Sequence, residues 1–209
     1  MARVVTLAVL VSGAGTTLDG LAERILAGQL PAQIGLVISD RLGAPAIERA
    51  RRRGLDTLVR PLRTSPSGAA WTDAVAPEIE RKEVDVIVLA GFLSILPKEF
   101  LHRFPDRIIN LHPSLLPKYG GPGMYGLRVH TAVLRAGETE TGVTVHRVIE
   151  AVDAGPILWQ VRVPVLPDDT PERLRARMHP IEVQALAATI TRFAREELPL
   201  PARSSSTGD

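Results

Sequence analysis

Short apolar runs alternate with amphipathic segments over the first half of this 209-residue sequence, and this alternation constrains the fold more than any other feature. The first run, 4–11, is apolar except for Thr6, which is typical of a strand buried on both faces of a sheet. The same pattern predicts further strands at 34–39, 55–59, 84–90 and 107–111. With helices between most of them, these strands predict an α/β fold: a Rossmann-like, doubly wound, mostly parallel sheet with helices on both faces.

The segments between the strands have helical periodicity. Residues 17–27 place their leucines and isoleucine on one stripe, as expected of a helix that packs on a sheet. The segment 45–53 begins with proline and is followed by Gly54, which are typical first and last signals of a helix. Further helices are predicted at 71–82, where Pro77 would kink or break the helix, and at 96–103.

The pattern changes after residue 117. A glycine-dense loop at 120–126 carries Met124 and Tyr125 at its centre, which we interpret as part of a cover, and a helix is predicted at 127–136. Strands at 141–149 and 157–165, joined by a turn, predict antiparallel additions to the C-terminal side of the sheet. A final helix is expected from Thr170 to about residue 196.

No internal repeat or linker divides the sequence, so we predict one domain at 1–198. The remaining residues, 199–209, are rich in proline, serine and glycine, which predicts a disordered tail. The apolar fraction of 45% is enough for a sizeable core.

Cysteine is absent, which excludes disulfides, thiol catalysis and cysteine-ligated metals. The sequence has no apolar run long enough to span a membrane and no signal-peptide cleavage site, so we expect a cytoplasmic protein without a membrane partner. The net charge is only +2 and aromatic residues make up 4%, which argues against a nucleic-acid partner. The sequence carries no signal for an oligomeric state.

The five histidines do not predict a metal site. No two have the i,i+4 spacing of a zinc-binding helix, and although His179 and Glu182 can share a helix face, no third ligand is evident. We therefore expect no bound metal. We place His102 and His130 on helix surfaces and His146 in the interior of a strand, with its hydrogen bonds satisfied.

The segment 12–17, between the first strand and the first helix, is a glycine-rich turn. Free backbone N–H groups at a helix N-terminus bind anions, and the glycines let a ligand approach closely. The turn is not a P-loop, and Leu18 replaces the third glycine of a dinucleotide fingerprint, although Asp40 stands where that fingerprint would want a ribose-binding acid. We therefore favour a single phosphate over a dinucleotide.

Asn110 and His112 lie at the end of the predicted strand 107–111 and are followed by Pro113. Because proline disfavours the helical conformation in the residue before it, His112 is held extended. Two polar side chains two positions apart then point to the same side of the chain. They leave the sheet at its carboxyl end, which is where open α/β sheets bind ligands.

Asp153 follows the end of an apolar strand and precedes alanine, glycine and proline, so we predict that it lies in a turn. Aspartate is a common turn residue in its own right. An acid beside a histidine also stabilises the imidazolium and raises its pKa. His112 needs such a partner if it is to act as an acid near neutral pH.

Four segments together resemble the glycinamide ribonucleotide formyltransferases, which belong to the folate formyltransferase superfamily. These segments are 11–18 (VSGAGTTL), 88–93 (VLAGFL), 110–119 (NLHPSLLPKY) and 152–156 (VDAGP). The resemblance runs in order from residue 4 to about residue 195. The chain is too short for the extra domain of a methionyl-tRNA formyltransferase or of a formyltetrahydrofolate hydrolase, so the glycinamide ribonucleotide enzymes are favoured.

The resemblance implies a role for several residues. Asn110, His112 and Asp153 match the catalytic trio of the family. The implied phosphate-binding residues are Gly15, Thr16 and Thr17, and those implied near the ribose and amine of the acceptor are His179 and Glu182. The implied folate-binding residues are Leu93, Ser94, Ile95, Leu96, Ile149, Glu150, Ala151, Val152 and Gly68. Ser94 and Gly68 stand at or near positions where family members often carry arginine, and Thr17 replaces a frequent asparagine.

The function implied by the resemblance is transfer of a formyl group from 10-formyltetrahydrofolate, the co-substrate, to the amine of glycinamide ribonucleotide. Asn110 and His112 would stabilise the oxyanion, and Asp153 would orient His112. Ser114 lies in no nucleophile elbow, so no covalent intermediate is expected. The alternatives are a related folate-dependent formyltransferase or hydrolase, and a non-catalytic Rossmann-type nucleotide-binding module.

Overall fold

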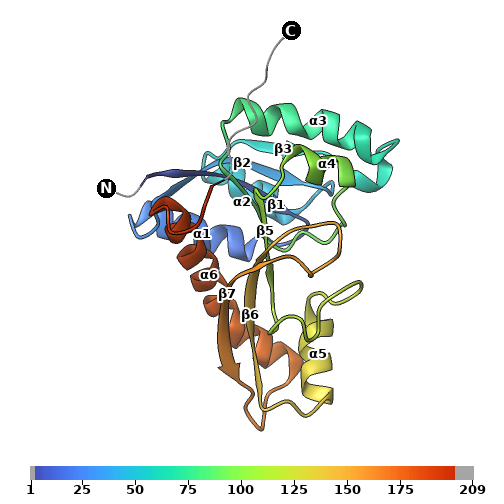
Figure 1. The fold of residues 1–209 in the computed structure, drawn as a ribbon, viewed down its shortest axis with the longest axis vertical. Coiled ribbons are helices and arrows are strands. Elements are labelled where there is room, and N and C mark those ends of the chain that lie inside the picture. The colour runs from blue at the N-terminus through green and yellow to red at the C-terminus, as the bar shows by residue number, and fades with distance from the viewer. Residues whose placement is uncertain (1–2, 201–209) are drawn as a thin grey trace.

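A single seven-stranded sheet forms the centre of the computed structural model, which describes residues 3–200. Its strands are β1 (Val5–Val11), β2 (Ala32–Ser39), β3 (Thr57–Val59), β4 (Val86–Leu89), β5 (Ile108–His112), β6 (Glu140–Arg147) and β7 (Ile157–Pro164). Their order is β3-β2-β1-β4-β5-β6-β7 (Figure 1). The first five strands are parallel, and β6 and β7 are antiparallel. The predicted α/β class with antiparallel C-terminal additions is confirmed.

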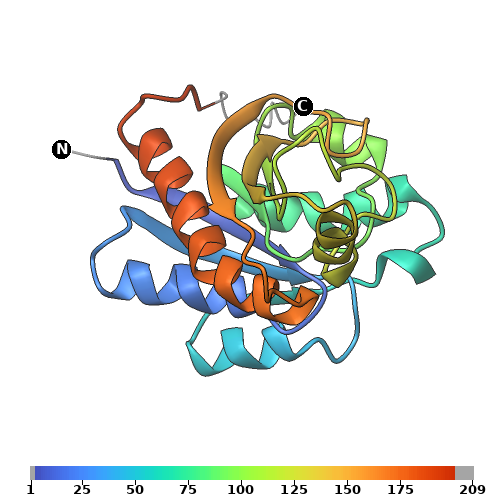
Figure 2. The ribbon, with the colours of Figure 1, turned by 90° about the horizontal axis from the view of Figure 1, so that it is seen from below.

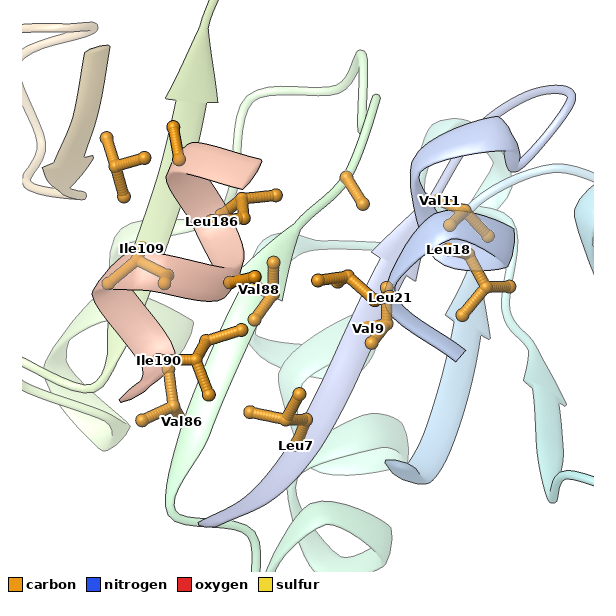
Figure 3. Packing of buried hydrophobic residues seen from close by; sticks show 14 of the residues in the cluster. Leu7, Val9, Val11, Leu18, Leu21, Val86, Val88, Ile109, Leu186 and Ile190 are labelled. Carbon is orange, nitrogen blue, oxygen red and sulfur yellow. The ribbon is translucent and has the colours of Figure 1, made fainter. Parts of the chain in front are cut away.

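Helices cover both faces of the sheet (Figure 2). They are α1 (Thr16–Leu26), α2 (Pro45–Arg52), α3 (Gly68–Arg81), α4 (Lys98–Arg103), α5 (Leu127–Arg135) and α6 (Pro171–Ala194), with a 3₁₀ turn η1 (Leu62–Thr64). Because successive strand residues face opposite sides, Val9 packs with α1, α2 and α6 while Leu10 packs with α3 and α4. Figure 3 shows the first of these layers, where Leu186 and Ile190 of α6 lie over Val86, Val88 and Ile109.

The boundaries differ from the sequence prediction by a few residues at most elements, and at α3 the difference has a clear cause. Ser67 accepts a hydrogen bond from the Ala70 N–H at 3.0 Å, so this helix begins three residues earlier than predicted. Pro77 lies inside α3 without ending it, so of the predicted kink or break, the break is wrong. The packing of Trp71, Val75 and Ile79 against the sheet holds the helix together across the proline.

The end of the domain packs on its own core. The Pro199 carbonyl accepts a hydrogen bond from Arg147 at 3.1 Å, and Leu200 packs against the apolar layer beneath α6. The rest of the predicted tail, 201–209, lies outside the described residues, so its disorder stays a prediction. None of the helices between residues 3 and 200 is long and apolar enough to cross a membrane.

Candidate active site

A cleft of about 1090 Å³ opens at the carboxyl ends of β1, β4 and β5. The chain crosses from β1 to β2 on one side and reaches β4 on the other, so the cleft lies at the point where the strand order reverses. Its walls come from the turn at 13–17, the segment 89–96, the end of β5, the loop 121–127 and the first half of α6. The volume lies just above the range of about 300–1,000 Å³ that is typical of small-molecule sites.

Asn110, His112 and Asp153 meet in this cleft. β5 presents Asn110 and His112 on the same side, and Asp153 reaches them from the turn after β6. Its Oδ2 lies 3.4 Å from His112 Nδ1, and its Oδ1 accepts from Asn110 Nδ2 at 3.4 Å. The Gly121 N–H also donates to Asp153, at 2.9 Å. The residues of the predicted trio therefore surround one carboxylate, which also anchors the loop at 121.

His146 belongs to the same cluster, which the sequence did not predict. Its Nε2 lies 3.1 Å from Asn110 Nδ2 and 3.5 Å from Asp153 Oδ1. Its Nδ1 lies 2.8 Å from the Arg147 carbonyl oxygen, and because a carbonyl oxygen only accepts, Nδ1 carries a hydrogen. The prediction of a hydrogen-bonded interior histidine is correct, but its functional position arises because β5 and β6 pair Asn110 directly with His146.

Both ring nitrogens of His112 face acceptors. Nε2 donates to the Tyr119 carbonyl at 2.7 Å, and Nδ1 faces Asp153. Burial nevertheless lowers the pKa of His112 below its ordinary 6.5, because the raising effects of the Asp153 charge and the Tyr119 carbonyl do not fully offset desolvation. The sequence led us to expect a raised pKa; Asp153 acts in that direction, but the depth of the cleft decides the net shift.

Asp153 itself is held in its charged form. Burial raises the pKa of Asp153, but the hydrogen bond from His146, the charge of His112 and the Gly121 N–H outweigh it and lower the pKa overall. Its backbone has φ 56°, in the left-handed region that aspartate and asparagine tolerate better than most residues. The turn predicted from the sequence is therefore also the conformation that aims the carboxylate.

His130 is not on a helix surface, so that prediction is wrong. It is only 1% exposed, on the side of α5 that faces the cleft. Burial lowers the pKa of His130, while the charge of Glu182 acts in the opposite direction. The sequence predicted a helix at 127–136 but could not show that its inner face borders a cleft.

We expect the protein to lose stability as the pH falls below about 6.5. His112 and His130 both have pKa values lowered by burial, so below the ordinary value of 6.5 the unfolded chain binds protons that the folded chain does not. Their contribution is complete above pH 6.5 and is lost as the pH falls toward the folded pKa values. Thermal unfolding from pH 8 to 5 measures this loss of stability. The Tm of the His112→Asn/His130→Leu double variant should depend less on pH than that of the wild-type protein. An equally steep dependence would show that these two histidines do not cause the loss.

The turn at 13–17 leads into the N-terminus of α1 and has the backbone features of an anion site. Gly15 has φ 78° and ψ 25°, and no side chain caps the helix, so its first N–H groups have no side-chain acceptor. A Cβ on Gly15 would lie 2.6 Å from the Ala46 Cβ, which leaves room only for glycine. The predicted phosphate residues Gly15, Thr16 and Thr17 all line the cleft, where a helix N-terminus favours an anion.

Gly15→Ala is expected to raise the KM for a phosphorylated substrate at least tenfold, because the added methyl group meets Ala46 and displaces the turn. Gly28→Ala is the matched control: Gly28 also has a positive φ, 67°, but nothing lies within 4 Å of an added Cβ. Steady-state kinetics and thermal unfolding of both variants separate backbone strain from the loss of the anion site. Equal KM values for the two variants would contradict the assignment.

Asp40 is not a ribose-binding acid, contrary to the dinucleotide interpretation. It is 4% exposed, and its two carboxylate oxygens accept hydrogen bonds from the hydroxyls of Ser12, at 2.6 Å, and Ser94. The Ser12 hydroxyl oxygen also accepts from the Leu93 N–H at 2.8 Å. Asp40 therefore links the turn that follows β1 to the segment 93–96 through hydrogen bonds, which explains why an acid stands at the end of β2.

The cleft has an apolar end. Leu93, Ile95 and Ile149 line it and are 42%, 69% and 42% exposed, an unusual exposure for large apolar side chains that suits a flat organic ring. Most of the predicted folate-binding residues line the cleft: Leu93, Ser94, Ile95, Leu96, Ile149, Glu150 and Val152. Ala151 and Gly68 do not line it, and Gly68 instead begins α3 beside Pro97 and Glu99.

The remaining predicted residues also line the cleft. His179 and Glu182 lie one turn apart on α6, with His179 Nδ1 3.5 Å from Glu182 Oε2. Met124 and Tyr125 of the glycine-rich loop line it as well, and the Arg128 guanidinium lies 4.9 Å from the centre of the Tyr125 ring. Within residues 3–200, no cluster of three or more histidines and acids could hold a metal ion.

Comparisons with known proteins point to one family. The formyl transferase family matches residues 5–190. A phosphoribosylglycinamide formyltransferase of Haemophilus influenzae is 37% identical over 194 residues, which cover 93% of this chain and 89% of that protein. A solved structure of the phosphoribosylglycinamide formyltransferase from Coxiella burnetii is 37% identical, with a TM-score of 0.87, covering 96% of this chain and 92% of that one.

A more distant structure shares the fold alone. A formyltetrahydrofolate deformylase from Pseudomonas syringae has a TM-score of 0.83 at 23% identity, covering 97% of this chain and 65% of that one. The fold by itself therefore accommodates more than one formyl chemistry. Because the family match spans most of the sequence and the Haemophilus relative is similar along nearly its whole length, this chain belongs to the formyl transferase family.

Proposed function

We propose that this protein transfers the formyl group of 10-formyltetrahydrofolate to the amine of glycinamide ribonucleotide, a step of purine biosynthesis. The observation that carries the proposal is the convergence of Asn110, His112 and Asp153 in one cleft between an anion site and an apolar wall. The similarity to phosphoribosylglycinamide formyltransferases along nearly the whole chain supports the choice of substrates.

The two substrates suit the two ends of the cleft. The phosphate of the ribonucleotide binds at the N-terminus of α1, at Gly15, Thr16 and Thr17. The folate ring lies against the apolar segments at 93–96 and 149–152. The amine and the formyl carbon then meet between these ends, beside Asn110 and His112.

The reaction begins when the amine nitrogen attacks the formyl carbon and the carbonyl oxygen becomes an oxyanion. Negative charge beside His112 favours its protonation, and both ring nitrogens already face acceptors that hold the resulting imidazolium. The intermediate collapses by breaking the bond between the formyl carbon and N10 of the folate. The proton lost by the attacking nitrogen ends on that folate nitrogen, and no covalent enzyme intermediate forms.

Asn110 is positioned to donate to the oxyanion. Its amide nitrogen contacts His146 at 3.1 Å and Asp153 at 3.4 Å. The contact to Asp153 is long for a hydrogen bond, so this N–H is the one that can turn toward a substrate oxygen at little cost. A single donor of this kind typically contributes about 3–4 kcal/mol to lowering the barrier.

The test is an activity measurement on the purified protein. With 10-formyltetrahydrofolate and glycinamide ribonucleotide present, tetrahydrofolate and the formylated ribonucleotide should form in equal amounts. Release of tetrahydrofolate at the same rate without the acceptor would instead identify a hydrolase, and turnover only with a sugar-nucleotide amine would identify a related formyltransferase.

The non-catalytic alternative is tested by calorimetry. A nucleotide-binding module predicts tight binding of NAD at the glycine turn, unaffected by changes at His112. The burial and hydrogen bonding of Asp40 argue against it, because the acid is not available to a ribose.

A further inference from the structure

His130 is a buried polar side chain with an unpartnered ring nitrogen. It is 1% exposed, and its Nδ1 is buried without a hydrogen-bond partner within residues 3–200. An unsatisfied buried polar group costs free energy, and native structures contain few of them. The His130 side chain borders the cleft, so a ligand there can reach its ring.

The surroundings of His130 define the chemistry of that partner. α5 packs on the first turns of α6, shown in orange in Figures 1 and 2. The charged and titratable groups that face His130 are Glu182 and Arg175 from α6 and His112 from β5. Of these, Glu182 also lines the cleft and is only 13% exposed in its side chain, so it adds buried negative charge to this part of the wall.

The other parts of the proposed substrates already have suitable places. The phosphate belongs at the N-terminus of α1, and an anion at His130 would lie close to the carboxylate of Glu182. The folate ring belongs at the apolar segments 93–96 and 149–152. The amino group of the acceptor is the remaining polar group, and it donates hydrogen bonds to neutral imidazole nitrogens and is attracted by a carboxylate.

We propose that His130 binds the amino group of the acceptor, accepting an N–H hydrogen bond that turns the nitrogen lone pair toward the formyl carbon. This inference rests on the proposed function. Burial lowers the pKa of His130, and the charges of Arg175 and His112 lower it as well. The charge of Glu182 acts in the opposite direction, but the net pKa remains below 6.5. The ring is therefore neutral at pH 7, as an acceptor must be.

His130→Leu tests the proposal, because leucine fills similar space without polar atoms. The KM for glycinamide ribonucleotide should rise at least tenfold, while the Kd of the formyl folate stays within twofold. The Tm of the ligand-free protein should stay the same or rise, since an unsatisfied polar group is removed. His130→Gln retains a hydrogen-bond acceptor and should recover part of the lost affinity.

Val133→Ala is the matched control on the same helix. Val133 is fully buried in the core, so its truncation should lower the Tm without changing the KM for the acceptor by more than twofold. A His130→Leu protein with a lowered Tm and an unchanged KM would show that His130 is only structural and would overturn the proposal.

A second measurement targets the amino group itself. Calorimetry compares glycinamide ribonucleotide with an analogue in which hydrogen replaces the amine. The wild-type protein should bind glycinamide ribonucleotide at least tenfold more tightly than the analogue, and His130→Leu should bind the two equally. The same preference in both proteins would overturn the proposal. Failure of the wild-type protein to formylate glycinamide ribonucleotide would be a failure of the proposed function, whereas normal turnover with unchanged discrimination refutes only the role of His130.

Discussion

Replacing His112 by alanine is expected to lower kcat about 10²–10³-fold, the typical effect of removing one oxyanion donor. The residue is 3% exposed and lines the cleft together with Asn110 and Asp153. Its two ring nitrogens face the Tyr119 carbonyl and Asp153, which fix the ring at this point of the cleft. Steady-state kinetics should show the loss in kcat, and calorimetry should show both substrates bound within about tenfold of the wild-type affinity.

Ser114→Ala is the control for this experiment. Ser114 lies two residues away, is fully buried, and donates to the Lys118 carbonyl at 2.6 Å. Losing that hydrogen bond should cost about 1 kcal/mol of stability but should leave kcat within about twofold. Full activity in His112→Ala, or a large loss of kcat in Ser114→Ala, would refute the proposed roles.

Asp153→Asn is expected to lower kcat about 10²–10⁴-fold, the upper figure being the effect known for the acid that orients a catalytic histidine. Asparagine keeps the left-handed backbone and can still accept from the Gly121 N–H, so the substitution removes mainly the charge. Without that charge the pKa of His112 falls further, because Asp153 is the main influence that raises it. The limb of the kcat/KM profile that reports His112 should therefore move to lower pH.

Asp106→Asn is the matched control, because Asp106 also has a left-handed backbone, with φ 57°, on an exposed turn before β5. It should leave kcat and the pH profile unchanged. A pH profile of Asp153→Asn identical to that of the wild-type protein would mean that the carboxylate does not act through His112.

Much of the fold was predictable because its signals are local. Apolar runs such as 4–11 and 84–90 marked the buried strands, and amphipathic segments marked the helices that cover them. The end of α2 at Arg52, before Gly54, follows from rules that involve only neighbouring residues. At Pro77 a local rule predicted a kink or a break, and the break is absent because packing of α3 on the sheet holds the helix through the proline.

The candidate site was predictable where its residues sit in one motif. The extended segment from Asn110 to Pro113 and the turn before α1 reach the cleft as expected. The role of Asp40 was not predictable, because its hydroxyl partners Ser12 and Ser94 come from other segments of the chain. Nothing in the local sequence distinguishes a buried acid with two such partners from one that is free to bind a ribose.

The sequence by itself determined the strands, the helices, the glycine turn and the polar pair at the end of β5, since each depends on backbone preferences of adjacent residues. The tertiary structure alone decided which other groups join that pair. His146 enters through the register of β5 and β6, and His130 through the packing of α5 on α6. It also decided that the pKa of His112 is lowered rather than raised. Desolvation depends on every segment that closes around the imidazole ring, so it does not follow from the residues next to His112 in the sequence.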